Sequence, residues 1–323
     1  MKYEIHTDLA IEASAVENLE ISGHMSGIKS ESYRENYVTV TKVEILNKKG
    51  EAAVGKPKGN YITLEVPDLR TNLSEAFDET ERILTKELKN ILSLHSCRTI
   101  MVVGLGNRFV TPDALGPKVV DKLLVTRHLY GVLPEDVTEK MNSLCAVSPG
   151  VLGITGIETS EIISAVTESI KPDLIIAIDA LASKKTSRIS TTFQVSDTGI
   201  VPGSGIGNKR KGLTKETLGV PVIAIGVPTV IDAVAVANDA IELLIEAIKM
   251  NVKRDTPVFN ALSVFDNENR YDLISEVLSP SAGELIVTPK EVDSIIDEVS
   301  KIIAGSINEA VNGEMAKKLG EIL

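Results

Sequence analysis

The 323-residue sequence contains no tryptophan and only 3% aromatic residues, so its hydrophobic core must consist mainly of aliphatic side chains. Apolar residues nevertheless make up 43% of the chain, which is enough to build a substantial core. Isoleucine, valine, leucine and alanine are the usual filling of a parallel sheet covered by helices on both faces. The composition therefore favours an α/β protein.

Cysteines and long apolar runs are equally scarce. Cys97 and Cys145 form no CxxC pair and are too few for a disulfide framework, which favours a reducing, cytoplasmic setting. The longest apolar stretch, residues 220–231, contains two prolines and falls short of the roughly 18 residues that a membrane helix needs. The amino terminus has no apolar signal core. We therefore expect neither a membrane segment nor a secretion signal.

Positive charge is also in deficit, because the formal net charge is -11. This excess of acids repels polyphosphate and argues against direct binding of nucleic acid. The one basic cluster, residues 209–211, is short and is interpreted as a solvated loop. The four histidines, His6, His24, His95 and His128, have no metal-ligand spacing, so we expect no zinc site and no other bound metal.

Periodic patterns divide the chain into an antiparallel beginning and a longer alternation of strands and helices. Residues 36–46 and 61–66 alternate in the manner of strands and predict an antiparallel subregion within residues 36–67, at the edge of the sheet. Further strands are expected at 99–104, 143–147, 173–179, 188–195 and 220–226, and helices at 74–94, 114–130, 157–170, 231–249 and 292–311. We predict an α/β fold with a mostly parallel sheet, helices on both faces and a single principal domain.

Two aspartates follow successive apolar strands of this predicted sheet. Asp113 lies in the segment after strand 99–104, and Asp179 closes strand 173–179. Because the carboxyl ends of parallel strands form the functional crevice, acids from two such strands can share a proton, one acting as general base and the other as general acid. Three alternatives remain open. Asp113 could cap the next helix, Asp179 could bind nearby backbone N–H groups, or both could hold a divalent metal together with further ligands.

The glycine-rich segment Gly104, Leu105, Gly106 and Asn107 suggests a dinucleotide site, but the pattern is incomplete. That fingerprint needs a third glycine at the start of the helix and an acid about 20 residues further on. Here residues 108–113 intervene instead. The glycines are therefore interpreted as a tight turn after the strand, and no cofactor is expected. A nucleotide-binding protein without proteolytic activity remains the alternative.

Six blocks of sequence resemble the germination protease family, endopeptidases of spore-forming bacteria that begin the degradation of small acid-soluble spore proteins. The blocks are residues 7–10, 103–107 leading to 111–117, 148–153, 178–182, 203–208 and 226–230. The resemblance implies a fold related to that of the hydrogenase maturation endopeptidases, a homotetramer, and a location in the cytoplasm of the forespore, the spore core. It also implies catalytic roles for Asp113 and Asp179, supported by loop residues Gly104, Gly106, Asn107, Ser148 and Gly150.

The related hydrogenase maturation enzymes bind a metal with two acids and a histidine. No histidine follows strand 173–179 in this chain, so an aspartic-type mechanism is expected. A metal-dependent endopeptidase is the alternative.

The resemblance further implies cleavage after an acidic residue and before a large apolar one. Residues 2–9 reproduce this pattern of charge and bulk. We therefore expect a prosegment of residues 1–8, removed by self-cleavage between Asp8 and Leu9, and a single protease domain at residues 9–323. Recognition of the acidic residue requires a cation or N–H donors. The candidates are Arg108, Lys184, Lys185, Lys209, Arg210 and Lys211.

Overall fold

The computed structural model describes residues 8–13, 27–71, 73–93, 95, 97–201, 211–253, 256–257, 259, 267–278, 285–313 and 315. These residues contain one nine-stranded sheet. Its strands are β1 (Ile28–Glu35), β2 (Val38–Ile45), β3 (Gly59–Glu65), β4 (Thr99–Gly104), β5 (Ser143–Val147), β6 (Leu174–Ser183), β7 (Thr192–Ser196), β8 (Val222–Asp232) and β9 (Ile286–Val287).

The sheet has a parallel half and an antiparallel half. Its strand order is β1-β2-β3-β7-β8-β6-β4-β5, and β9 pairs with β8. Strands β5, β4, β6 and β8 run parallel, whereas β1, β2, β3, β7 and β8 pair in antiparallel fashion. The predicted α/β class with an antiparallel extension near the amino terminus is confirmed. The extension begins earlier than expected, at β1, and β7 joins it to the parallel half.

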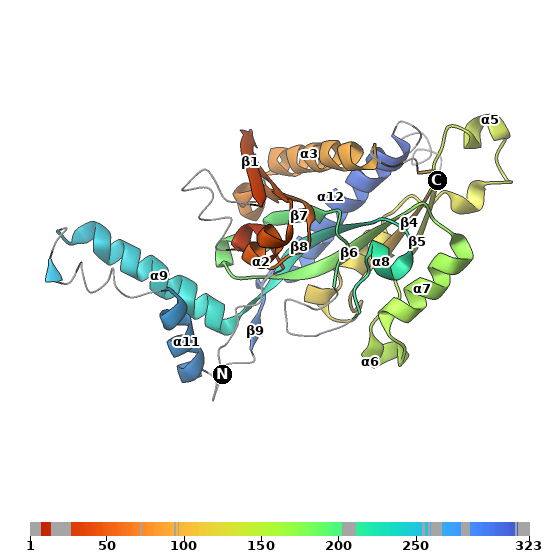
Figure 1. The fold of residues 1–323 in the computed structure, drawn as a ribbon. Helices are drawn as coiled ribbons and strands as arrows, with labels where there is room; N and C mark the ends of the chain where they lie inside the picture. Colours follow the sequence, from red (N-terminus) through yellow and green to blue (C-terminus); the bar gives the residue numbers. More distant parts are fainter. Residues whose placement is uncertain are drawn as a thin grey trace.

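Helices cover both faces of the sheet (Figure 1). The α-helices are α2 (Lys48–Val54), α3 (Ser74–Leu92), α4 (Leu115–Val120), α5 (Glu135–Thr138), α6 (Leu152–Thr155), α7 (Thr159–Ile170), α8 (Lys215–Leu218), α9 (Ala233–Asn251), α11 (Asn267–Leu278) and α12 (Val292–Asn312). Short 3-10 turns are η1 (Ala10–Glu12), η2 (Pro67–Thr71), η3 (Thr111–Asp113), η4 (Arg127–Leu129) and η5 (Thr186–Arg188).

The largest core cluster lies between the sheet and helices α3, α4 and α12. Its side chains are almost all aliphatic, as the composition requires, and Phe193 is the one aromatic residue among its fully buried members. On the opposite face, Ile163 of α7 packs against β4 and β6 through Met101, Val103 and Ile175. The parallel half of the sheet is therefore covered on both faces, which explains its continuous apolar strands.

The helix predicted for residues 114–130 is much shorter than expected, because α4 ends at Val120. Beyond it, the fully buried Thr126 binds the edge of the sheet instead of continuing the helix. Its N–H donates to the carbonyl of Leu144 at 2.9 Å, and its hydroxyl donates to the carbonyl of Asn142 at 2.7 Å. Tertiary hydrogen bonds to β5 therefore override the helical pattern of the sequence.

Asp297 links α12 to the segment after α4. Its carboxylate lies 2.9 Å from Lys122 Nζ and 2.7 Å from Lys301 Nζ. Hydrogen bonds from Lys301 and then Lys122 lower the pKa of Asp297 to about 2. Because the pKa is lowered in the folded state, this stabilisation is present above the unfolded pKa of roughly 3.9 and is lost as the pH falls through about 2.

We expect Asp297→Asn to lower the free energy of unfolding by about 0.5 kcal/mol at pH 7, a small effect because the ion pairs are solvent-exposed. The difference from wild type should shrink as the pH approaches 2. Urea unfolding at several pH values measures this trend. The exposed Asp272→Asn on α11 serves as control and should change stability little at any pH. A destabilisation by Asp297→Asn that is independent of pH would contradict the assignment.

Candidate functional site

The candidate site opens where β4 ends beside β6. Gly104, the last residue of β4, pairs with Ile178, and the N–H of Leu105 donates to the Ile178 carbonyl at 2.8 Å. β6 does not end at Asp179 as predicted, because β8 accompanies it as far as Ser183. The end of β4, rather than the end of β6, therefore exposes one edge of the sheet next to Asp179.

Asp113 is held at this edge by the loop that follows β4. It belongs to η3, which lies against β6 and β8. One carboxylate oxygen, Oδ2, accepts a hydrogen bond from the Asn107 N–H at 2.8 Å. Gly106 has a φ of +104°, and a Cβ at this position would lie 2.0 Å from the Asp113 carbonyl oxygen. The glycine therefore lets the loop fold closely around Asp113.

The helix-capping alternative for Asp113 does not hold. The N-cap residue of α4 is Ala114, and no side chain provides a capping hydrogen bond there. Gly104 contributes to the same arrangement, since a Cβ on it would lie 2.3 Å from the Gly116 carbonyl oxygen. Close approach of α4 to β4 therefore requires the glycine, and this approach places η3 over the end of the strand.

Asp179 lies deep in the sheet, with 5% of its surface exposed. Its Oδ1 accepts a hydrogen bond from the N–H of Ala180 at 3.0 Å, so the local backbone contact expected for a strand aspartate is present. In the sheet it is paired with Gly226 of β8. Since Gly104 lies beside Ile178, the loop holding Asp113 and the strand holding Asp179 meet at the same edge. Their catalytic role stays a prediction.

The other loop residues predicted to support the site follow β5 at the same edge. Val147 pairs with Val103 of β4, so Ser148 directly follows the paired residues. Gly150 has a φ of +76°, which favours glycine, and its carbonyl accepts a hydrogen bond from the Thr159 hydroxyl at 3.2 Å. The start of α7 thereby fixes this loop beside the end of β4.

Asp8, the first described residue, binds the edge of β6 that β4 leaves open. Its N–H donates to the Ala182 carbonyl at 3.3 Å, and its Oδ2 accepts from the Ala182 N–H at 3.0 Å. The side-chain amide of Gln194 donates to the Asp8 carbonyl at 2.9 Å. The expected processing site therefore lies alongside the strand that carries Asp179, next to a residue about 10 Å further along it.

The residues after Asp8 are built into the domain. Leu9 is fully buried in a cluster with Val43, Ile45 and Leu181. Glu12 has 1% of its side chain exposed and lies 3.3 Å from Arg188 Nη1. It also accepts hydrogen bonds from the Ser183 hydroxyl at 2.8 Å and the Lys184 N–H at 2.9 Å. An apolar anchor and a buried ion pair therefore fix this segment.

The cations expected to recognise an acidic substrate residue are dispersed. Arg108 makes hydrogen bonds of 2.6 and 3.0 Å to Asp121, which raise the pKa of the guanidinium group. Lys184 and Lys185 follow β6 next to Glu12, and Lys211 is exposed. Lys209 and Arg210 lie outside the described residues. Arg108 is thus paired with Asp121, and Lys184 is next to the amino-terminal segment through Glu12.

Sequence reasoning missed Lys56, which lines a cavity of about 260 Å³ together with Asp8. It lies just after α2, between the two strands that the sequence predicted at residues 36–46 and 61–66. No local pattern marks this lysine, because its neighbours come from distant parts of the chain.

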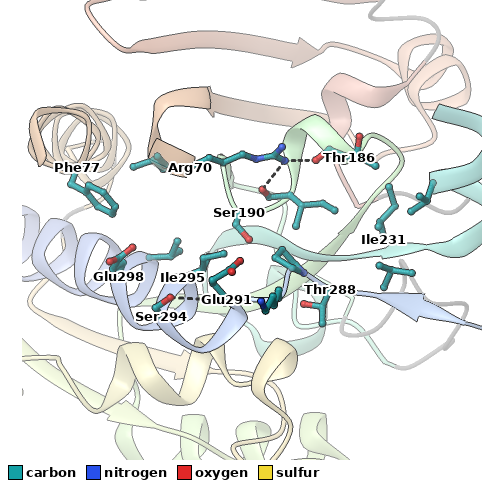
Figure 2. A pocket seen from close by; sticks show the side chains of 17 residues that line it. Arg70, Phe77, Thr186, Ser190, Ile231, Thr288, Glu291, Ser294, Ile295 and Glu298 are labelled. Atoms are coloured by element: carbon teal, nitrogen blue, oxygen red, sulfur yellow. Dashed lines mark hydrogen bonds between the residues drawn. The ribbon is translucent and has the colours of Figure 1, made fainter. Parts of the chain in front are cut away.

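A larger cavity of about 640 Å³ lies on the other side of β6, between η2, η5, β9 and the start of α12 (Figure 2). Arg70 extends along its wall and donates a hydrogen bond to the Ile189 carbonyl at 3.4 Å and another to the Thr186 carbonyl. Neither Asp113 nor Asp179 lines this cavity. It is therefore separate from the candidate site.

Within the described part of the chain, no group of three or more histidine, cysteine, aspartate or glutamate side chains is arranged to hold a metal ion. Over the same residues, no helix has the length and apolar character needed to cross a membrane.

The sequence pattern described as germination protease matches residues 4–265 and 251–321. The chain belongs to the germination protease family. It is 48% identical over 321 residues to the germination protease of Clostridium acetobutylicum, with 98% of each chain covered. Identity to the Clostridium tetani protein is 47% over 307 residues, with 95% of each covered. The protein is therefore a protease, which sets aside the nucleotide-binding alternative.

The similarity extends to more distant members of the family. The germination protease of Bacillus cereus is 42% identical over 350 residues, covering 97% of this chain and 95% of that protein. Among solved structures, the [NiFe] hydrogenase maturation protease HycI from Thermococcus kodakarensis aligns at 16% identity with a TM-score of 0.33, covering 68% of this chain and 97% of HycI.

Proposed function

We propose that the protein is a self-processing endopeptidase that starts the degradation of small acid-soluble spore proteins in the spore core during germination. It cuts after glutamate or aspartate and before a large apolar residue. One observation carries the proposal: in a member of a protease family, two aspartates and the expected processing site all lie along the edge that opens where β4 ends beside β6.

In the proposed mechanism, Asp113 and Asp179 act as a coupled pair around one water molecule. The ionised carboxylate removes a proton from the water, whose oxygen attacks the peptide carbonyl, while the protonated carboxyl group donates its proton to the carbonyl oxygen. Collapse of the tetrahedral intermediate breaks the C–N bond and transfers a proton to the leaving nitrogen. The pair titrates as a unit, so neither aspartate alone is assigned as the base.

The amino-terminal segment supports synthesis as a zymogen. Asp8 lies opposite Ala182, roughly 10 Å along β6 from Asp179. Leu9 is held in its apolar cluster and Glu12 in its ion pair. We infer that these contacts hold the Asp8–Leu9 bond against β6 and make self-processing slower than cleavage of a free substrate.

Incubation of the full-length chain tests this proposal. Intact-mass measurement and amino-terminal sequencing should reveal loss of residues 1–8 and a new terminus at Leu9. A chain that stays uncut, or that is cut only elsewhere, would contradict self-processing at this bond. Cleavage should survive exhaustive chelation, because two carboxylates suffice to activate water; loss of activity that added metal restores would favour the metal-dependent alternative.

The proposed homotetramer is supported by exposed apolar residues on α9 and α11, which project from the body of the molecule (Figure 1). Leu243 and Leu244 of α9 are 59% and 58% exposed, and Leu273 and Val277 of α11 are 51% and 75% exposed. Apolar surface gathered in this way is typical of subunit contacts.

We expect the double substitution Leu243→Glu and Leu244→Glu to reduce the assembly to smaller species, because two charges would have to be buried in the contact. Light scattering coupled to size-exclusion chromatography measures the mass. Glu246→Gln on the same helix is the control and should leave the mass unchanged. An unchanged tetramer in the double variant, or a monomeric wild type, would contradict this assignment of the contact.

A further inference from the structure

The cavity that contains Lys56 lies on the face of the sheet to which Asp179 points. Gly226, which lines the cavity, is paired with Asp179, and paired residues of neighbouring strands face the same side. The Leu181 side chain packs over Gly226 on this face, since a Cβ on Gly226 would lie 2.4 Å from Leu181 Cδ1. The cavity and the buried aspartate are therefore neighbours on one face.

The lining of this cavity suits a carboxylate. Apart from Asp8, the polar residues around it are neutral or cationic: Lys56, Tyr61, Gln194, Ser196, Thr198 and Thr214. Gln194 holds the segment in place from both sides, since its amide donates to the Asp8 carbonyl and its Oε1 accepts from the Ala10 N–H at 2.6 Å. The backbone of Asp8 is thus anchored where its side chain shares a cavity with Lys56.

Lys56 is directed to this position by the end of α2. Gly55 has a φ of +72° and ends the helix, and Lys56 follows it into the cavity. Burial lowers the pKa of Lys56, the negative charges of Asp8 and Glu12 oppose this effect, and Lys184 adds to it. Burial of an ammonium group is unfavourable without an anion, so Lys56 favours a carboxylate beside it.

We propose that Lys56 recognises the acidic residue that precedes the cleaved bond, first Asp8 during self-processing and then the glutamate or aspartate of the substrate. This inference rests on the proposed function. Glu12 cannot replace the substrate acid, because it is already bound by Arg188, Ser183 and the Lys184 N–H. Departure of residues 1–8 would therefore leave a cation in a polar cavity, ready for the next acidic side chain.

Four full-length proteins test the pairing: wild type, Asp8→Asn, Lys56→Gln and the double variant. Loss of a charged hydrogen-bond partner should slow self-cleavage by about 10- to 100-fold in each single variant. If the two side chains act through each other, the double variant should be no slower than the slower single variant. A double variant whose self-cleavage is slowed by the product of the two single effects would overturn the proposal. Lys58→Gln, an exposed lysine of the same turn, is the control and should cleave itself at the wild-type rate.

The processed enzyme extends the test to free substrates. Wild type should cleave a Glu-Phe peptide much faster than the matching Gln-Phe peptide. The Lys56→Gln variant, allowed to process to completion, should lower the ratio of kcat/KM for Glu-Phe to kcat/KM for Gln-Phe by about 10-fold or more. Most of this change should come from a lower kcat/KM for the Glu-Phe peptide. An unchanged ratio would overturn the proposal, whereas Lys58→Gln should retain the wild-type ratio.

The same substitutions in an Asp179→Asn background separate this inference from the proposed function. These uncut chains allow the coupling between Asp8 and Lys56 to be measured from thermal unfolding midpoints. Absence of cleavage by the wild-type protein would contradict the proposed function. Non-additive shifts in the midpoint would still support recognition of the acid by Lys56, and additive shifts would overturn it.

Discussion

Asp113→Asn and Asp179→Asn will each slow self-cleavage and substrate cleavage by about 10³-fold or more, because an amide cannot take up the proton of the attacking water. The substitutions are conservative for the fold. Asp113 Oδ2 accepts from the Asn107 N–H, and Asp179 Oδ1 accepts from the Ala180 N–H, and an asparagine oxygen can keep either bond. A loss of activity with an unchanged unfolding midpoint would therefore report the missing carboxylate.

Asp121→Asn is the matched control for this pair. Asp121 lies only eight residues after Asp113, but its carboxylate forms a solvent-exposed ion pair with Arg108. The Asp121→Asn variant should retain activity within a few-fold of wild type, since exposed ion pairs contribute little to stability. Intact-mass kinetics of the full-length chains measures all three variants. Retained self-cleavage in Asp113→Asn or Asp179→Asn would remove that residue from the mechanism.

That the strands leading to Asp113 and Asp179 are neighbours could be anticipated from sequence, because it depends on a general property of parallel sheets. Apolar strands 99–104 and 173–179 were recognisable from local pattern, and their carboxyl ends must lie at one edge. The detail that failed is the end of the second strand, since β6 continues past Asp179 alongside β8. Local pattern gives no information on how far a neighbouring strand extends.

β1 and Lys56 escaped prediction for the same reason. β1 reads Ile-Lys-Ser-Glu-Ser-Tyr-Arg-Glu, with little apolar content, and it is a strand because it pairs with β2 along its full length. The contact between Asp8 and Ala182 joins residues 174 positions apart. Asp8 in turn lines the cavity that contains Lys56. Features created by long-range pairing leave no periodic signal in the sequence.

Gly106→Ala should also cause a large loss of self-cleavage, because it displaces Asp113. It does so without altering any ionisable group. The added Cβ would lie 2.0 Å from the Asp113 carbonyl oxygen and 3.0 Å from Oδ1, and the φ of +104° is unfavourable for alanine. The loop must move, which breaks the hydrogen bond from the Asn107 N–H that orients the carboxylate. We expect self-cleavage to fall by about 10²-fold or more, mainly in kcat, since small misplacements of catalytic groups have effects of this size.

The effect of misplacement can be separated from that of backbone strain by Gly131→Ala. Gly131 also has a positive φ, +86°, but no atom lies within 4 Å of the position its Cβ would occupy. Both variants should be destabilised by about 1–3 kcal/mol through strain, as measured by urea unfolding. Only Gly106→Ala should lose activity. Equal activity in the two variants would mean that the loop after β4 does not position Asp113, and that other contacts orient its carboxylate.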